Sequence, residues 1–324
     1  MPELDQQTIQ KIASQEIIPK TIAFCPALTV GEIDDIPRLS AIATAVALMY
    51  WGDQTMDRGD EAVAQAIELL ATPQPPTDPV VRARRGALTH IKALIDQLAL
   101  PDDAPYVLAC FYDQVLKHEV TLHRLSQEYL AAPDRQRFLA DHASLIAETT
   151  TISAGFPSIA SSLYAIYRQH DTALPPLAHI YSSTAMTNLL QVCNVVVRLW
   201  DELGDWQMDS GHDPRKGLFV INPLNEYHPA IVRRFCELAF IDDARQIRTL
   251  QEACANFHTD HQKYTPVILA TLREHIRQYL LALDSRLSAP FGQYVTLCKR
   301  VMEIGYVNRI GDIALTSPDS DQPT

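Results

Sequence analysis

Apolar residues recur at helical spacing along most of the chain, and the alternating pattern of a strand is hard to find. Short polar or proline-rich pieces, such as 72–79 and 174–176, interrupt this pattern and predict loops. With 324 residues and 47% hydrophobic content, the chain can bury a large core as one helical domain. We therefore expect an all-α fold over residues 1–313, followed by a disordered tail at 314–324.

The stretch 194–209, NVVVRLWDELGDWQMD, carries the clearest chemical signal. In a helix, one face of this stretch presents five polar side chains: Asn194, Arg198, Asp201, Asp205 and Asp209. Carboxylates one turn apart repel each other, and the apolar residues between them indicate a mostly buried helix, where isolated charge is costly. Mg²⁺ prefers oxygen ligands, so the three aspartates predict a metal site. The alternative is a solvated acidic face on a surface helix.

A second acidic pair lies upstream, in the sequence YWGDQTMDRGD at 50–60. Asp53 and Asp57 fall one helical turn apart after an apolar run at 39–49. Two such helices facing each other would enclose an apolar cavity with a carboxylate rim, which suits a prenyl diphosphate. The alternative for this pair is simple solvation at a helix end before Gly59.

Between the two acidic motifs, Pro157 after Gly155 predicts a helix break, because proline lacks a backbone donor and clashes with the preceding turn. The local sequence taken alone favours an ordinary helix end. A break placed between the acidic motifs could instead direct backbone dipoles toward positive charge on a hydrocarbon.

Four segments resemble class I terpene synthases. RLWDELGDWQMD at 198–209 is similar to their second metal motif, and GDQTMDRGDEA at 52–62 to their aspartate-rich motif. ETTTISAGFPSIASSLYAIY at 148–167 resembles their broken helix, and YVNRIGD at 306–312 resembles the C-terminal segment that closes over the site. Thr149, Thr150 and Thr151 stand where the family commonly has a diphosphate-sensing arginine, and Arg168 cannot be matched to it. The likeness runs from about Ser40 to Asp312.

The resemblance implies a single-domain helical bundle around an apolar active-site cavity. It implies two or three Mg²⁺ ions, with Mn²⁺ as an alternative, held by five residues: Asp53, Asp57, Asp201, Asp205 and Asp209. Basic and aromatic residues near the motifs are candidates for binding the diphosphate or a carbocation. Together with two residues of the helix break and Asn194, the substrate-binding candidates are Tyr50, Trp51, Gly155, Phe156, Asn194, Arg198, Trp200, Lys216, Tyr306 and Arg309. The alternatives are an ion pair within the helix for Arg198 and packing between helices for the tryptophans.

The expected reaction is ionisation of a C15 or C20 prenyl diphosphate, or of a pre-cyclised diterpenyl diphosphate. Cyclisation or rearrangement and quenching by deprotonation or water would then give a terpene hydrocarbon or alcohol. Two alternatives remain: a head-to-head prenyl synthase of the squalene and phytoene synthase kind, and a non-catalytic prenyl-diphosphate binding protein. An upstream prenyltransferase or class II cyclase would supply the substrate, and the family's habit of pairing is compatible with a homodimer.

Composition and charge bear on the partners and the cellular location of the protein. The formal net charge of −12 and the lack of a basic tract argue against nucleic-acid binding. Six scattered cysteines without a CxxC pair fit reduced thiols, and the apolar run at 39–49 is shorter than the roughly 20 residues of a membrane span. Residues 1–20 lack the apolar core of a secretory signal. We expect a cytoplasmic protein without a membrane span.

Overall fold

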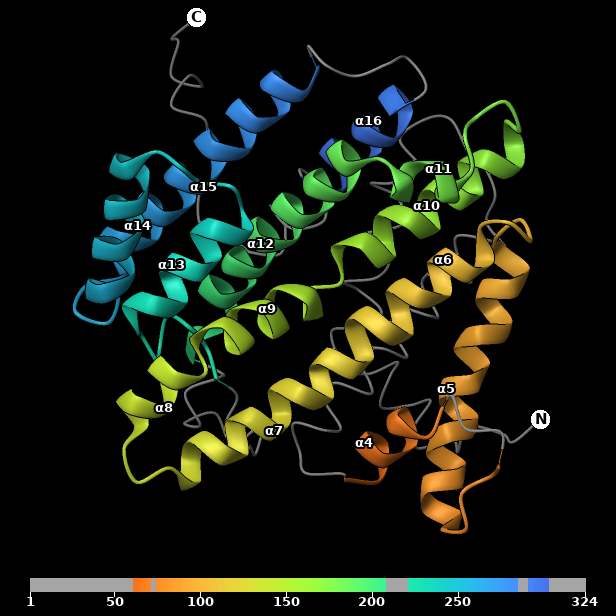
Figure 1. Cartoon of the computed structure of the whole chain (residues 1–324), viewed down its shortest axis with the longest axis horizontal. Helices are drawn as coiled ribbons and strands as arrows, with labels where there is room; N and C mark the ends of the chain where they lie inside the picture. The colour runs from red at the N-terminus through yellow and green to blue at the C-terminus, as the bar shows by residue number, and fades with distance from the viewer. Residues whose placement is uncertain (1–60, 71–73, 208–220, 285–290, 303–324) are drawn as a thin grey trace, which may run out of the picture.

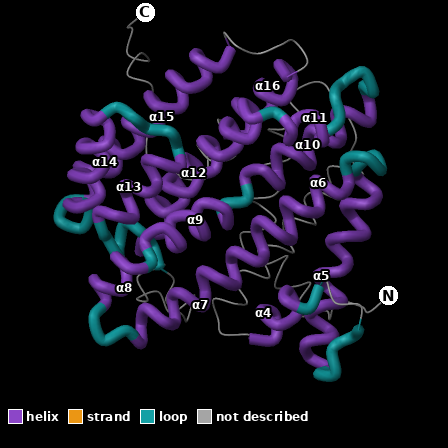
Figure 2. The backbone as a smooth tube through the Cα atoms, viewed as in Figure 1, coloured by secondary structure: helices purple, strands orange, loops and turns teal. Residues whose placement is uncertain are grey.

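The computed structural model describes residues 61–70, 74–207, 221–284 and 291–302, which form helices joined by loops and turns. In chain order the helices are α4 (Glu61–Glu68), α5 (Pro79–Leu98), α6 (Ala104–Ala109), the π-helix η1 (Cys110–Leu116), α7 (Lys117–Ala131), α8 (Arg135–Asp141), α9 (Ala143–Ser153), α10 (Phe156–His170), α11 (Leu177–Ser182), α12 (Thr184–Gln207), α13 (Pro229–Leu238), α14 (Ala244–Asn256), α15 (His261–Asp284) and α16 (Gly292–Val301). Strands are absent from these four ranges, so the predicted all-α class is confirmed (Figure 2).

Capping residues explain where several helices begin. Asp78 precedes Pro79 at the start of α5, and its Oδ1 accepts hydrogen bonds from the Val80 and Val81 amides at 2.7 and 3.3 Å. Asp243 caps α14 in the same way, with its Oδ1 2.7 Å from the Arg245 amide nitrogen. The predicted loop at 72–79 is thus confirmed over 74–78, while Pro79 is the first residue of α5 and 72–73 lie outside the described ranges. The predicted loop at 174–176 lies between α10 and α11, and the short α11 separates it from α12.

Helix α12 runs through the middle of the fold. It packs against α9, α10, α11, α13 and α15. The segment from α6 through η1 to α7 is one uninterrupted helical run that lies alongside α9 and α10, while α14 and α15 pack together at the other side of α12 (Figure 1). Helix α12 is therefore packed against five other described helices.

A hydrophobic core joins side chains from α4 to α16. On α12, Val195, Val196 and Val197 are fully buried, and each buried valine stabilises the fold by roughly 1.5–3 kcal/mol relative to an exposed one. Within the described part of the chain, no helix combines the length and apolar character needed to cross a membrane. The proposed end of the domain at residue 313 and the tail at 314–324 lie outside the described residues.

Candidate functional site

The break between α9 and α10 lies in the middle of the bundle, and its position agrees with the prediction from Gly155 and Pro157. Helix α9 ends at Ser153 and α10 starts at Phe156, which is fully buried. Gly155 has φ = 70°, a left-handed conformation that glycine adopts without the steric penalty of a β-carbon. Val115 of the π-helix η1 packs against this turn, since its Cγ2 would lie 3.4 Å from a β-carbon at Gly155.

Asn194 of α12 connects this break to the predicted acidic face. Its Oδ1 accepts a hydrogen bond of 3.2 Å from the Phe156 amide, the first backbone donor of α10. The contact is buried and joins residues 38 positions apart. An amide at a helix start has no partner within its own helix, so a side chain from α12 satisfies it. Asn194 therefore acts as a structural link between α12 and the break.

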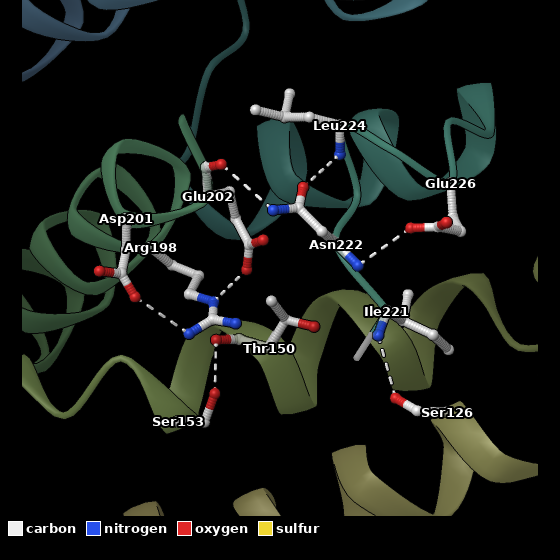
Figure 3. Close-up of polar contacts among 10 residues, drawn as sticks. All are labelled: Ser126, Thr150, Ser153, Arg198, Asp201, Glu202, Ile221, Asn222, Leu224 and Glu226. Atoms are coloured by element: carbon white, nitrogen blue, oxygen red, sulfur yellow. Dashed lines mark hydrogen bonds and ion pairs between the residues drawn. The ribbon is translucent and has the colours of Figure 1, made fainter. Parts of the chain in front are cut away.

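One helical turn further along α12, Arg198 contacts two carboxylates (Figure 3). Its Nε pairs with Glu202 Oε1, and its Nη1 donates to Asp201 Oδ2 at 3.3 Å. We call Arg198, Asp201 and Glu202 the α12 ion cluster. Their side chains are 12%, 15% and 1% exposed, so the cluster is largely withdrawn from water. The ion pair within the helix, which was the alternative for Arg198, is thus present.

Helix α9 and the segment after residue 220 lie on two sides of the α12 ion cluster (Figure 3). Thr150 of α9 lies beside Arg198 and Glu202, and its backbone oxygen accepts from Ser153 Oγ at 3.0 Å. On the other side, Asn222 Nδ2 donates to the Glu202 carbonyl oxygen at 3.1 Å. Thr150 is fully buried, and its hydroxyl has no hydrogen-bond partner among the residues that the structure describes. A buried hydroxyl without a partner is uncommon and marks a place where a ligand or water can bind.

The remaining predicted residues are distributed as follows. Asp205 lies on α12, on the face that carries Asn194, Arg198 and Asp201. Trp200 is buried in the core, and a helix with 3.6 residues per turn directs it about 200° away from Arg198. Eight predicted site residues lie outside the described ranges: Tyr50, Trp51, Asp53, Asp57, Asp209, Lys216, Tyr306 and Arg309.

Two aromatic residues near the motifs have packing roles. Trp206 is partly exposed and stacks edge-on against Phe257, with 5.6 Å between ring centroids. Tyr164 is buried, packs edge-on against Tyr294 at 5.0 Å, and donates its hydroxyl proton to the Pro175 carbonyl oxygen at 2.8 Å. Packing between helices, the alternative considered for the tryptophans, describes the contact of Trp206, and Tyr164 packs in the same way.

A second buried arginine lies at the other end of α10. Arg168 Nη1 donates to Asp103 Oδ2 at 2.6 Å, and Arg168 Nε donates to the Leu174 carbonyl oxygen at 3.2 Å. The other oxygen of Asp103 accepts from the Leu177 amide at 2.8 Å. We call Asp103 and Arg168 the α10 ion pair. It ties α10 to the residue that precedes α6 and to the start of α11, which gives Arg168 a structural role.

A network of hydroxyl and thiol groups occupies the core near α11 and α16. Tyr181 OH lies 2.9 Å from Cys110 Sγ and 2.8 Å from Ser161 Oγ. Burial raises the pKa of Tyr181 well above its ordinary value and also raises the pKa of the Cys110 thiol. Both groups therefore stay neutral and serve as hydrogen-bonding partners rather than as nucleophiles. The five described cysteines are all unbridged and buried, as expected for reduced thiols, and Cys25 lies outside the described ranges.

Three features of this site were not predicted from the sequence. Glu202 had a signal, because it follows Arg198 by four residues with opposite charge. The α10 ion pair joins residues 65 positions apart, and no local pattern indicates it. The π-helix η1 likewise has no recognised sequence signal, although such irregular turns often occur at functional sites.

The donor chemistry of the cluster suits a hard cation, since Asp201 offers carboxylate oxygens at low exposure. Within the four described ranges, three or more acidic, histidine or cysteine residues do not gather into a metal-binding group, but Asp53, Asp57 and Asp209 lie outside those ranges. Comparison with protein-family models, curated proteins and solved structures found no match.

Proposed function

We propose that the chain is a class I terpene synthase, which ionises a prenyl diphosphate and converts the resulting cation to a terpene hydrocarbon or alcohol. One observation carries this proposal: the polar face of α12 lies against the break between α9 and α10. Asn194 bonds to the first amide of α10, and Arg198 and Asp201 follow on the same face. Buried ionisable groups and irregular backbone are both common at functional sites.

A metal site fits this face. Asp201, Asp205 and Asp209 on one side, with Asp53 and Asp57 on the other, would hold two or three Mg²⁺ ions, or Mn²⁺ in their place. When bound, the ions would supply positive charge that turns the diphosphate into a leaving group. The aspartates would therefore set where the diphosphate end of the substrate lies.

Other residues of the chain would handle the diphosphate and the hydrocarbon. The Arg198 guanidinium would donate hydrogen bonds to phosphate oxygens, with the planar geometry that suits such groups. The apolar residues around the break, Phe156 among them, would keep bulk water from the cation until it rearranges. The backbone dipoles at the break would stabilise positive charge on the hydrocarbon.

The experiment that tests this proposal is incubation of the purified chain with C10, C15, C20 and C25 prenyl diphosphates, with Mg²⁺ or with EDTA. Diphosphate release and extractable products would be measured, the latter by mass spectrometry. We expect a hydrocarbon or alcohol with the carbon number of its substrate, formed only when metal is present. Metal-independent turnover would contradict the proposal.

The same assay separates the alternatives. A product with twice the carbon number would identify a head-to-head prenyl synthase. Metal-dependent binding of a prenyl diphosphate without release of diphosphate would identify a binding protein. If every linear substrate is inert, a diterpenyl diphosphate made by a class II cyclase is the next substrate, and failure with that substrate too would overturn the enzyme assignment.

A further inference from the structure

The two carboxylates of the α12 ion cluster hold Arg198 unequally. Glu202 is 1% exposed and makes the closer contact, through the Arg198 Nε. Asp201 is 15% exposed, and its 3.3 Å contact with Nη1 is longer than the 2.7–2.9 Å typical of charge-assisted hydrogen bonds. Arg198 is therefore anchored at Glu202 and held more weakly at Asp201.

We propose that Glu202 is a positioning residue that anchors Arg198. The Arg198 guanidinium pairs with the Asp201 carboxylate until a diphosphate group binds the guanidinium in its place. This inference rests on the proposed function, in which Asp201 is a metal ligand. A carboxylate oxygen that accepts from a guanidinium is a poorer ligand for a cation, so Arg198 and the metal ion compete for Asp201. Phosphate oxygens are strong acceptors for arginine, and their arrival frees Asp201.

The arrangement couples metal binding to diphosphate binding. The metal ion and diphosphate each weaken the contact between Arg198 and Asp201, and that contact opposes the binding of both. Such coupling is reciprocal by thermodynamic necessity. Glu202 keeps the guanidinium near the site throughout the exchange, because its contact with Nε differs from the contact that breaks. Without diphosphate, the site then holds metal weakly.

A separate observation marks a place for the diphosphate beside Arg198. The Thr150 side chain projects from α9 on the side that carries Arg198 and Glu202 (Figure 3). Its buried hydroxyl, without a hydrogen-bond partner in the described part of the chain, can donate to a phosphate oxygen that Arg198 also binds. A buried hydroxyl without a partner among the described residues, on a residue next to the α12 ion cluster, offers a hydrogen bond to an anionic ligand that binds there.

The test measures Mn²⁺ binding by electron paramagnetic resonance, with Mn²⁺ alone and with inorganic diphosphate. In the wild-type chain, diphosphate should tighten Mn²⁺ binding. Arg198→Met should tighten binding of Mn²⁺ alone by about tenfold and abolish most of the effect of diphosphate, because about 1.4 kcal/mol of competition is removed. Glu202→Gln should weaken binding of Mn²⁺ alone by about three- to tenfold, because the released guanidinium pairs more fully with Asp201.

A double variant separates positioning from direct metal binding. If Glu202 acts only through Arg198, adding Glu202→Gln to Arg198→Met should leave Mn²⁺ affinity unchanged. A further loss of affinity in the double variant would show that the Glu202 carboxylate acts on the metal ion other than through Arg198, and would overturn the proposal. The matched control is Glu274→Gln, which disrupts the exposed contact with Arg277 on α15 and should leave Mn²⁺ binding unchanged. Circular dichroism and thermal unfolding would confirm that each variant is folded.

The outcomes distinguish this inference from the proposed function. If the wild-type chain binds no Mn²⁺ even with diphosphate, the proposed function fails and the inference fails with it. If the wild-type chain binds Mn²⁺ and diphosphate together but Arg198→Met leaves the affinity for Mn²⁺ alone unchanged, only the inference fails.

Discussion

The α10 ion pair and the α12 ion cluster both bury an arginine beside carboxylates, but their partners differ. In the α10 ion pair, one arginine meets one aspartate, and backbone groups at Leu174 and Leu177 complete their hydrogen bonding. Asp103 lies 65 positions from Arg168 and 74 positions from Leu177, so these bonds join distant segments. In the α12 ion cluster, one arginine meets two carboxylates within one turn of the same helix.

This difference indicates that the α10 ion pair and the α12 ion cluster have different roles. The α10 ion pair stabilises the tertiary arrangement, because its bonds connect residues 65 and 74 positions apart. The contacts of Arg198 with Asp201 and Glu202 connect neighbours that α12 brings together in any case. Burying charge costs free energy, and these two contacts do not join distant segments, so we interpret the α12 ion cluster as serving function.

The largest expected effect is on stability at the α10 ion pair. Asp103→Asn leaves Arg168 buried without its counter-charge, and we expect a loss of about 3–5 kcal/mol in the free energy of unfolding. Urea denaturation would measure this. Asp102→Asn is the matched control, because Asp102 is exposed and adjacent, and its effect should stay within about 0.5 kcal/mol. A loss at Asp103 no larger than at Asp102 would remove the structural role of this pair.

Asp201→Asn should affect turnover strongly and stability little. Arg198 keeps its contact with Glu202, so the free energy of unfolding should change by less than about 1 kcal/mol. Turnover should fall at least about 100-fold, because a metal ligand is lost. Asp141→Asn, in an exposed ion pair on α8, is the control and should leave both quantities unchanged. Wild-type turnover in Asp201→Asn would refute the metal-ligand role of Asp201.

The sequence was sufficient for the features that depend on local preference. Helical periodicity predicted the all-α class, and Gly155 with Pro157 predicted the break, because both residues restrict the backbone directly. The spacing from Asn194 to Asp205 predicted one shared face, and α12 extends far enough to place these residues on it.

The sequence was insufficient where distant segments meet. Asn194 was predicted to bind substrate, but helical spacing gives no sign of its contact with the Phe156 amide. Glu202 was overlooked because its carboxylate gains importance only through burial between α12, α9 and the segment around Asn222, which depends on tertiary packing. Trp200 adjoins Asp201 in sequence, yet the helix directs the two side chains apart.

Asn194→Val would break the link between α12 and the start of α10. It removes the side-chain acceptor of the buried Phe156 amide, which should cost about 1–3 kcal/mol. We expect faster hydrogen exchange at Phe156 than in the wild-type chain, along with a lower free energy of unfolding. Asn256→Ala removes a side-chain bond to an exposed backbone oxygen on α14 and should have little effect. Equal protection of Phe156 in Asn194→Val and wild type would mean that Asn194 does not hold the break.

The smallest effect concerns two buried hydroxyls that a sequence does not distinguish. Ser126 Oγ donates to the Leu122 carbonyl oxygen at 2.8 Å and accepts from the Ile221 amide at 3.0 Å, so Ser126→Ala should destabilise the chain by about 1–3 kcal/mol. Thr150 has no partner for its hydroxyl among the described residues, so the nearly isosteric Thr150→Val should leave stability unchanged or raise it by up to about 1 kcal/mol.

For diphosphate binding we expect the opposite order, with the larger effect at Thr150 and the smaller at Ser126. Thr150→Val should weaken the binding of inorganic diphosphate measured with Mn²⁺, because a donor beside Arg198 is lost, whereas Ser126→Ala should not. If Thr150→Val destabilises the chain as much as Ser126→Ala and leaves diphosphate binding unchanged, Thr150 is an ordinary core residue. The α12 ion cluster would then lack the second phosphate donor that distinguishes it from the fully satisfied α10 ion pair.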